Sequence, residues 1–554
     1  MKADALARCA ELQGSIESLV KATEAREIDN ARAAYGEVRR RERDLSPTIR
    51  ALAPMSSAGL GAYGTDKDDG AEGFRPLHSA LAADPPDFKR ANERAKTARV
   101  AAKSLCAEAG LLAWTSAQLG YALSDGAYVF GLRLDGSDAP DEPTRVRDTQ
   151  AEGGGLLRQI VTVRDAVRAQ NPAIADALDA DALVLSNFLK SLDGLAAGTD
   201  PLVRNTAAMV RATGPLGLHF RKAFAPSAEA RIQPPYVGAR GEEAVSAGTF
   251  PRARHPRDAA KAELGKRLFE STVLSDNGRV ACVSCHVEAT AFSRTGARPQ
   301  GANGRPTARE PMSLLNVGYE VAFFWDGRAG SLEDQLDTVL DRDMSTTWPA
   351  VLDRLTKDEQ LSASFRSVTQ AEPTVASTKA ALVAYQRTLV LDDLPMDRFF
   401  RGKDDALSPE AALGFDLFFG KARCSRCHRL PLTSGIVGPR FLETELSSIG
   451  VPRVRGGKTR DPDEGRGTVT KNKEDRAMFR VPTLREITKT APYFHNGSFA
   501  TLDQVVDFYA DGAGLSVEVD TPNLDPEVQR FKLTADQKKA LLAFLRTGLS
   551  TSAP

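Results

Sequence analysis

The sequence predicts a mainly α protein in which an N-terminal helical bundle precedes two smaller modules related by internal duplication. The first 235 residues are rich in Ala, Arg, Glu and Leu, with apolar residues at helical spacing. In the remainder, the pattern Leu-Gly-x-x-Leu-Phe occurs twice, each time before the same short cysteine motif. With 554 residues, the chain is about three to four times as long as a typical domain, so several cores are expected.

The composition excludes several classes of protein. Lys and Arg together number 73, and Asp and Glu also number 73, so the formal net charge is zero. A dedicated nucleic-acid-binding protein would show a strongly basic balance, and this chain does not. Hydrophobic residues at 42% and aromatic residues at 6% are typical of an ordinary soluble globular protein.

No segment of the sequence is typical of a membrane span or a targeting signal. The longest uncharged stretch, residues 109–124, is shorter than the roughly 20 apolar residues that span a bilayer, so we interpret it as a buried helix. We therefore expect no transmembrane segment. The N-terminus lacks the apolar region and the small-residue cleavage site of a secretory signal.

The N-terminal bundle is expected over residues 1–235, as a helical domain whose role the sequence does not indicate. Polar loops are expected near residues 56–72 and 134–154. The pair Pro234-Pro235 cannot continue a helix, so the domain boundary is placed there. The apolar positions that indicate the first helix are Leu12, Ile16, Leu19 and Val20.

Two cysteines of this domain, Cys9 and Cys106, stand apart from any motif. In an oxidising compartment they would form a disulfide that joins two helices. The alternative is a pair of buried thiols, because free cysteine is among the most buried residue types.

The other four cysteines lie in two copies of Cys-x-x-Cys-His, formed by Cys282, Cys285 and His286 and by Cys424, Cys427 and His428. Two cysteines three positions apart on a short turn present both sulfurs to one face, where they can form thioethers with the vinyl groups of one haem. The adjacent histidine then reaches the iron as its proximal ligand. A zinc site would need four clustered ligands, and a redox dithiol does not call for the histidine. The motifs therefore predict two covalently bound haem c groups.

Each motif follows a predicted helix. Residues 264–269 and residues 413–418 both place two leucines on one helical face with a phenylalanine beside them. The C-terminal half is therefore predicted to hold two cytochrome-c-like haem domains, over residues 236–400 and 401–554.

Capping patterns mark two helix starts in the second of these domains. Ser408 followed by Pro409 is typical of an N-cap and first helical position. Thr534 with Gln537 forms a capping-box pattern, which predicts a last helix running to about Thr547.

These segments carry a family resemblance. The run from about Arg252 to Gly548 resembles the bacterial dihaem cytochrome c peroxidase superfamily, which includes the MauG-type enzymes. The matching segments are LGKRLFESTVLSDNGRVACVSCH, FFWDGRAGSLEDQ, GFDLFFGKARCSRCH and FRVPTLREITKTAPYFHNGSFATLDQVVDFY. The resemblance implies that hydrogen peroxide binds at the haem of His286 and that His428 holds an electron-handling haem. It also implies that Trp325 is an electron relay between the two haems.

The resemblance extends to the sixth ligand of the second haem. Fourteen residues after the His of the PYFH motif, peroxidases of the superfamily carry a methionine and MauG-type members a tyrosine. Counting from His495 gives Tyr509, which implies a closer relation to the MauG-type branch. Tyrosinate is a hard donor that favours ferric iron. The alternative is a Tyr509 that only packs on the inner face of its helix, with Met478 considered as the ligand.

The distal side of the first haem is implied to be open. Many peroxidases of the superfamily carry a second histidine about sixteen residues after the haem histidine, where this chain has Ala302. Gln335 matches the family's distal glutamine. Asp343 is the closest candidate for the acid that transfers protons during peroxide cleavage, with an ordinary solvated aspartate as the alternative.

A calcium ion lies between the haems in this superfamily. Its carbonyl ligands fall at Thr490 and Pro492, and its side-chain ligand falls at Glu310, whose carboxylate suits a hard cation. Thr490 and Pro492 would equally suit an ordinary turn.

Two functional classes remain open from the sequence. The first is a peroxide-dependent dihaem oxidoreductase, with electrons from a small cytochrome c, a cupredoxin or a protein substrate's side chain. The second is a dihaem electron-transfer cytochrome in which the helical domain is a docking module. Haem c is attached outside the cytoplasm, so we expect a periplasmic protein whose numbering omits its signal peptide.

Overall fold

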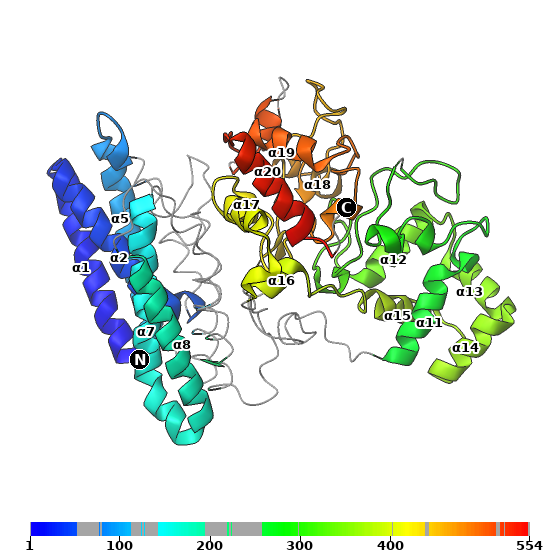
Figure 1. Cartoon of the computed structure of the whole chain (residues 1–554), viewed down its shortest axis with the longest axis horizontal. Helices are drawn as coiled ribbons and strands as arrows, with labels where there is room; N and C mark the ends of the chain where they lie inside the picture. The colour runs from blue at the N-terminus through cyan, green and yellow to red at the C-terminus, as the bar shows by residue number, and fades with distance from the viewer. Residues whose placement is uncertain are drawn as a thin grey trace. The chain divides into compact units, whose positions relative to one another are not determined.

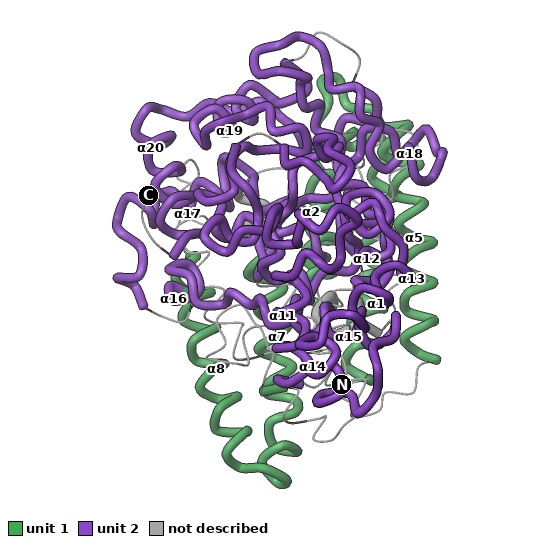
Figure 2. The backbone as a smooth tube through the Cα atoms, turned by 90° about the vertical axis from the view of Figure 1, so that its right-hand side faces the viewer, with its two compact units in different colours: residues 1–244, 400–402 green, residues 245–399, 403–554 purple. Residues whose placement is uncertain are grey.

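The computed structural model describes residues 2–52, 77, 80–111, 123, 127, 142–193, 216, 219–220, 223, 258–296, 298–400, 403–437, 443–516, 521–525 and 527–551. The described residues are mainly α-helical with little β-sheet, as the sequence predicts (Figure 1). The chain forms two compact units, residues 1–244 with 400–402, and residues 245–399 with 403–554 (Figure 2). Within the described part of the chain, no helix combines the length and the apolar character needed to span a bilayer.

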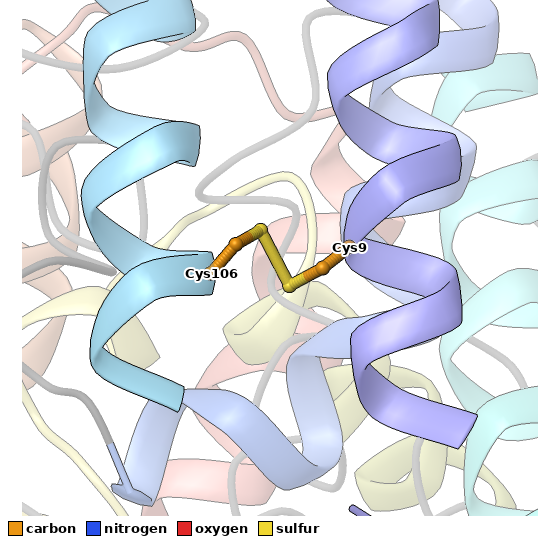
Figure 3. Close-up of a disulfide and its surroundings, with 2 residues drawn as sticks. All are labelled: Cys9 and Cys106. Carbon is orange, nitrogen blue, oxygen red and sulfur yellow. A yellow bond between two sulfur atoms is a disulfide. The ribbon is translucent and has the colours of Figure 1, made fainter. Parts of the chain in front are cut away.

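The first unit contains long helices that share apolar cores. They are α1 (Lys2–Glu24), α2 (Ile28–Leu52), α5 (Phe88–Leu111), α7 (Glu142–Gln170) and α8 (Pro172–Ser191). The residues expected on the inner face of α1 are buried, with Leu12, Ile16 and Leu19 at 0% exposure. Cys9 of α1 and Cys106 of α5 form a disulfide with their Cα atoms 5.6 Å apart (Figure 3). The structure thus decides between the two expectations for this pair.

One predicted loop of the first unit is wrong. The polar segment expected to end near residue 154 is helical from Glu142 onward, as the N-terminal part of α7. Burial explains the difference, because Glu152 at 2% exposure and Leu156 at 0% exposure pack inside the bundle. The predicted loop at 56–72, most of the predicted buried helix at 109–124 and the Pro234-Pro235 boundary lie outside the described residues.

The second unit contains ten α-helices among its described residues: α11 (Ala259–Glu270), α12 (Leu332–Arg342), α13 (Trp348–Lys357), α14 (Glu359–Thr369), α15 (Val375–Gln386), α16 (Pro395–Phe400), α17 (Pro409–Phe419), α18 (Arg466–Thr470), α19 (Leu502–Ala510) and α20 (Ala535–Ala543). Two short antiparallel ladders pair β1 (Ile436–Val437) with β2 (Glu443–Thr444) and β3 (Leu446–Ser447) with β4 (Phe479–Arg480). Ser408 caps α17 and Thr534 caps α20 with a full capping box, as predicted.

The two modules of this unit repeat one helix crossing. α11 packs across α15 in the first module, and α17 packs across α20 in the second. Each crossing is close because a glycine faces the partner helix. A Cβ atom on Gly265 would overlap the carbonyl oxygen of Ala381, and one on Gly414 would overlap that of Ala540. The glycine of the repeated Leu-Gly-x-x-Leu-Phe pattern is therefore needed in both modules for the close approach of the two helices.

A second repeated segment leads from each haem motif into a short helix. Asn316 and Glu486 both adopt left-handed φ before a one-turn 3₁₀ helix. Further along, Phe324 and Phe494 have φ of +65° and +70° at equivalent points. Ser331 and Thr501 then cap the N-termini of α12 and α19 with their side chains. Each position in residues 310–339 thus has a counterpart, at a constant offset, in residues 480–509.

Candidate haem sites

The first Cys-x-x-Cys-His motif opens onto a cavity of about 560 Å³, here called the first cavity. Cys282 begins a one-turn 3₁₀ helix, and the backbone N–H of His286 donates to the carbonyl of Cys282 at 2.9 Å. This tight turn places Cys282, Cys285 and His286 along the same cavity wall.

The second motif has the same local structure and lines a second cavity. The backbone N–H of His428 donates to the carbonyl of Cys424 at 2.9 Å, across a one-turn 3₁₀ helix. The second cavity encloses about 190 Å³ and is walled mostly by apolar side chains. Cys424, Cys427 and His428 line it together with Tyr509.

Both histidines are arranged as iron ligands require. The Nδ1 atom of His286 lies 2.8 Å from the carbonyl oxygen of Phe292, and that of His428 lies 3.0 Å from the carbonyl oxygen of Pro482. A Nδ1–H that donates to a carbonyl leaves Nε2 with its lone pair for a metal. Burial lowers the pKa of both imidazoles, that of His428 to about 4, so both rings are neutral at pH 7.

The cysteines also fit a haem rather than a reactive thiolate site. Burial raises the pKa of Cys282 to about 12 and that of Cys285 to about 11. Burial likewise raises the pKa of Cys424 to about 12. Thiols with such values are not poised for redox exchange. Two paired thiols and one neutral imidazole along each cavity therefore match a covalently attached haem in donor set and polarity.

The structure brings the predicted relay tryptophan and the two predicted distal residues to the first cavity. Trp325, Gln335 and Asp343 all line it together with His286. Burial raises the pKa of the Asp343 carboxyl, and the nearby Arg328 and Arg342 oppose this rise only in part. The Oε1 atom of Gln335 is buried and has no hydrogen-bond partner among the described residues. An acceptor left in this state can receive a hydrogen bond from a ligand in the cavity.

The internal repeat makes position 339 of the first cavity equivalent to position 509, the predicted ligand position of the second cavity. Val339 and Tyr509 are each the eighth residue of an equivalent helix, α12 and α19, and each lines its own cavity. The tyrosine presents a phenol oxygen, whereas the valine presents no donor atom. His286 is the only histidine among the described residues that line the first cavity, and Ala302 is not among them.

The two candidates for the second haem's sixth ligand differ in position. Tyr509 lines the second cavity, and Met478 is not among the described residues that line it. Burial of the phenol raises the pKa of Tyr509, so a nearby cation would be needed to hold it as tyrosinate. The geometry thus favours Tyr509 over Met478.

Trp325 lines both cavities. Its Nε1–H donates to the carbonyl oxygen of Glu310 at 2.9 Å, and its own carbonyl accepts from the backbone N–H of Arg480 at 2.7 Å. The indole is therefore held by a hydrogen bond within the first module, and the Trp325 backbone is hydrogen-bonded to the second module.

Two of the three predicted calcium ligands, Glu310 and Pro492, lie close to each other beside Gly497. Glu310 is 8% exposed, and burial raises the pKa of its carboxyl to about 7. A Cβ atom on Gly497 would lie 2.7 Å from Glu310 Oε1 and 3.1 Å from Pro492 Cγ, which places the carboxylate beside the Pro492 loop. Thr490 lies in the same loop. A buried carboxylate held against a loop is compatible with a hard cation.

Sequence reasoning missed a buried ion pair at the same junction, between Arg480 and Glu320. Nη1 of Arg480 lies 2.8 Å from Oε2 of Glu320, and each residue is 6% exposed. The internal repeat is the signal that could have found it, because Arg480 is the counterpart of Glu310 and Glu320 is the counterpart of Thr490.

Comparison with known proteins shows to which family the chain is similar. The sequence model of the di-haem cytochrome c peroxidase family matches residues 259–405. Cytochrome-c peroxidase IdrP1 of Denitromonas iodatirespirans is 36% identical over 323 residues, which cover 54% of this chain and 84% of that protein. Methylamine utilization protein MauG of Methylorubrum extorquens is 32% identical over 299 residues, covering 53% and 79% of the two chains. The crystal structure of a MauG-like protein associated with microbial copper homeostasis is 30% identical, with a TM-score of 0.48, and the match covers 53% of this chain and 90% of that one.

Proposed function

We propose that this chain, a member of the dihaem cytochrome c peroxidase and MauG superfamily, reduces hydrogen peroxide in the first cavity and takes the electrons through the second. The observation that carries the proposal is the asymmetry of the two cavities. The first combines a proximal histidine with a buried acid and no side-chain ligand at position 339, whereas the second has Tyr509 at the equivalent position. One cavity can therefore admit a small substrate, and the other is closed by its own side chain.

Haem iron, when bound, supplies the two-electron reduction of the peroxide O–O bond. The side chain of Asp343 would accept the proton from the near oxygen at its carboxylate oxygen and return it to the departing oxygen. Its raised pKa suits this exchange, because a carboxyl whose pKa lies above the ordinary range holds and gives up a proton more readily near the working pH than an ordinary aspartate does. The unpartnered Oε1 of Gln335 would accept a hydrogen bond from the bound peroxide and orient it.

The second cavity would handle electrons. His428 and Tyr509 would hold its iron, and a tyrosinate donor favours the oxidised metal. Trp325 would relay oxidising equivalents, since it borders both cavities, its ring donates a hydrogen bond to Glu310 of the first module, and its backbone carbonyl accepts one from Arg480 of the second.

The reductant would be a small cytochrome c, a cupredoxin or the side chain of a protein substrate. All three suit an enzyme of the periplasm, which is the compartment in which haem c is attached.

The resting ferric spectrum tests the proposal. An open first cavity and a closed second one should give one high-spin and one low-spin haem, and peroxide should rapidly perturb the high-spin signal. Two low-spin haems that do not respond to peroxide would refute the enzyme and support an electron-transfer cytochrome with a helical docking domain.

A further inference from the structure

The two modules meet through a reciprocal pair of backbone hydrogen bonds. The N–H of Glu310 donates to the carbonyl of His495 at 2.9 Å, and the N–H of Arg480 donates to the carbonyl of Trp325 at 2.7 Å. His495 is the counterpart of Trp325 in the internal repeat, and Arg480 is the counterpart of Glu310. The junction is therefore pseudo-twofold, with an acid at one of its equivalent positions and a base at the other.

The guanidinium of Arg480, at the basic position, makes few hydrogen bonds. Nη2 of Arg480 reaches only the thioether sulfur of Met312, at 3.2 Å. Nη1 touches Glu320 at 2.8 Å, but the pair lacks hydrogen-bond geometry, so neither Nη1 nor Nε has a hydrogen-bond partner among the described residues. The side chain is 6% exposed, so bulk water does not satisfy these donors either.

The location of Arg480 indicates what should satisfy it. Its side chain borders both the first and the second cavity. A guanidinium presents several N–H groups in a rigid fork that matches the two oxygens of a carboxylate. Buried native donors are nearly always paired, so an acceptor is expected in one of the cavities. Haem carries propionate carboxylates, which have this chemistry.

We propose that Arg480 is a carboxylate-binding residue of the haem junction, in which its unpartnered N–H groups donate to haem propionate and its charge is partly offset by Glu320. This inference rests on the proposed haem content of the cavities. On its side of the junction, the guanidinium of Arg480 would take the position that a cation bound by Glu310 would take on the other side. The junction then holds two positive charges, one from an ion and one from the chain itself.

Charge near a haem shifts its reduction potential. Substitutions that remove the charge of Arg480 and of Glu320 should therefore shift the potential in opposite directions. A cation favours the reduced iron, which carries less positive charge, and an anion favours the oxidised iron. Arg480→Met should lower the midpoint potential of at least one haem, because it also leaves Glu320 uncompensated. Glu320→Gln should raise the same potential. The double variant should lie between the two single variants.

The experiment is a spectroelectrochemical titration of the purified holoprotein without peroxide. Arg480→Lys retains the charge without the fork and should shift the potential less than Arg480→Met. Arg476→Met removes one exposed arginine from the same module and is the matched control, with little change expected because water screens its charge. The Arg480→Met/Glu320→Gln double variant keeps the junction neutral and is the fallback if Arg480→Met does not fold.

Shifts of opposite sign in the two single variants support the proposal. Shifts of the same sign, no shift in either, or a shift no larger than that of Arg476→Met would overturn it. The peroxide reaction plays no part in this measurement. A protein that shows the opposite shifts but does not respond to peroxide would refute the proposed function and leave the role of Arg480 standing.

Discussion

In the absence of a bound cation, the folding stability of this protein should fall as the pH rises, because of Glu310. Burial at 8% exposure raises the pKa of this carboxyl from 4.5 to about 7, and Arg298 opposes the rise only in part. A bound divalent cation would supply the opposite charge that the carboxylate lacks. The calcium-free protein should therefore prefer a protonated Glu310.

The sign and size of the effect follow from this pKa. The folded state binds the Glu310 proton more tightly than the unfolded chain does, so the contribution of Glu310 to folding stability is greatest below pH 4.5. That stability is lost as the pH rises toward 7, and the loss is complete above it. A change in pKa from 4.5 to about 7 corresponds to about 3 kcal/mol of unfolding free energy.

Denaturant unfolding of the holoprotein at pH 5 and pH 8, with a chelator or with calcium, measures this loss. The chelated protein should lose about 2.5 kcal/mol between the two pH values, because part of the loss has already occurred at pH 5, and calcium should restore most of it at pH 8. Glu310→Gln is the control, since it removes the titrating group and should flatten the difference. If the chelated wild-type protein loses no more stability than Glu310→Gln does, Glu310 is not a buried acid that needs a cation.

Four further substitutions test the site and the fold. Asp343→Asn should slow the peroxide reaction in stopped-flow by about 10²–10⁴-fold with the resting spectrum unchanged, and Asp343→Glu should retain more of the rate; an unaffected rate would place the proton transfer elsewhere. Tyr509→Phe should alter the low-spin spectrum while Met478→Leu leaves it unchanged, and the reverse result would reassign the ligand to Met478. Val339→Tyr should convert the high-spin haem to low-spin and abolish its peroxide response; a persistent high-spin signal would show that the two helices are not equivalent at this position. Gly414→Ala should destabilise the second module by about 1–3 kcal/mol in urea unfolding, because its Cβ atom overlaps the carbonyl of Ala540, and unchanged stability would refute so close a crossing.

The features that the sequence predicts correctly depend on a few contiguous residues. Ser408 and Thr534 cap their helices because each side chain reaches the backbone three residues ahead. The Cys-x-x-Cys-His turns form for a similar local reason, since the His286 N–H reaches back to Cys282. Such features need no knowledge of the rest of the fold.

The wrong prediction near residue 154 has the opposite origin. The glycine run 153–155 and its polar neighbours are typical of a loop, and each glycine inside a helix costs about 1 kcal/mol relative to alanine. Burial of Leu156 and Ile160 in the bundle outweighs this local preference. Tertiary packing of this kind is not visible in a short window of sequence.

The candidate site divides in the same way. The resemblance gave Trp325, Gln335 and Asp343, and the structure brings all three to the cavity of His286, although their roles stay predictions. The ion pair of Arg480 with Glu320 could not be found from local patterns, because the two residues are distant in the chain. Alignment of the chain with itself would have shown that Arg480 and Glu320 are equivalent to Glu310 and Thr490, two of the predicted calcium ligands.

The duplicated framework explains how one fold can support two different haem sites. Both modules share the glycine-mediated helix crossing, the histidine turn and the capped helix beside the cavity. Three of the pairs of equivalent side chains that differ border the cavities or their junction: Val339 and Tyr509, Trp325 and His495, and Glu310 and Arg480. Under the proposed function, the first pair would decide whether a cavity has an internal ligand. The second pair places one indole at the junction, and the third gives the junction an acid and a base. Because the backbone is common to both modules, these side chains, rather than the fold, must set the proposed division between a peroxide site and an electron-handling site.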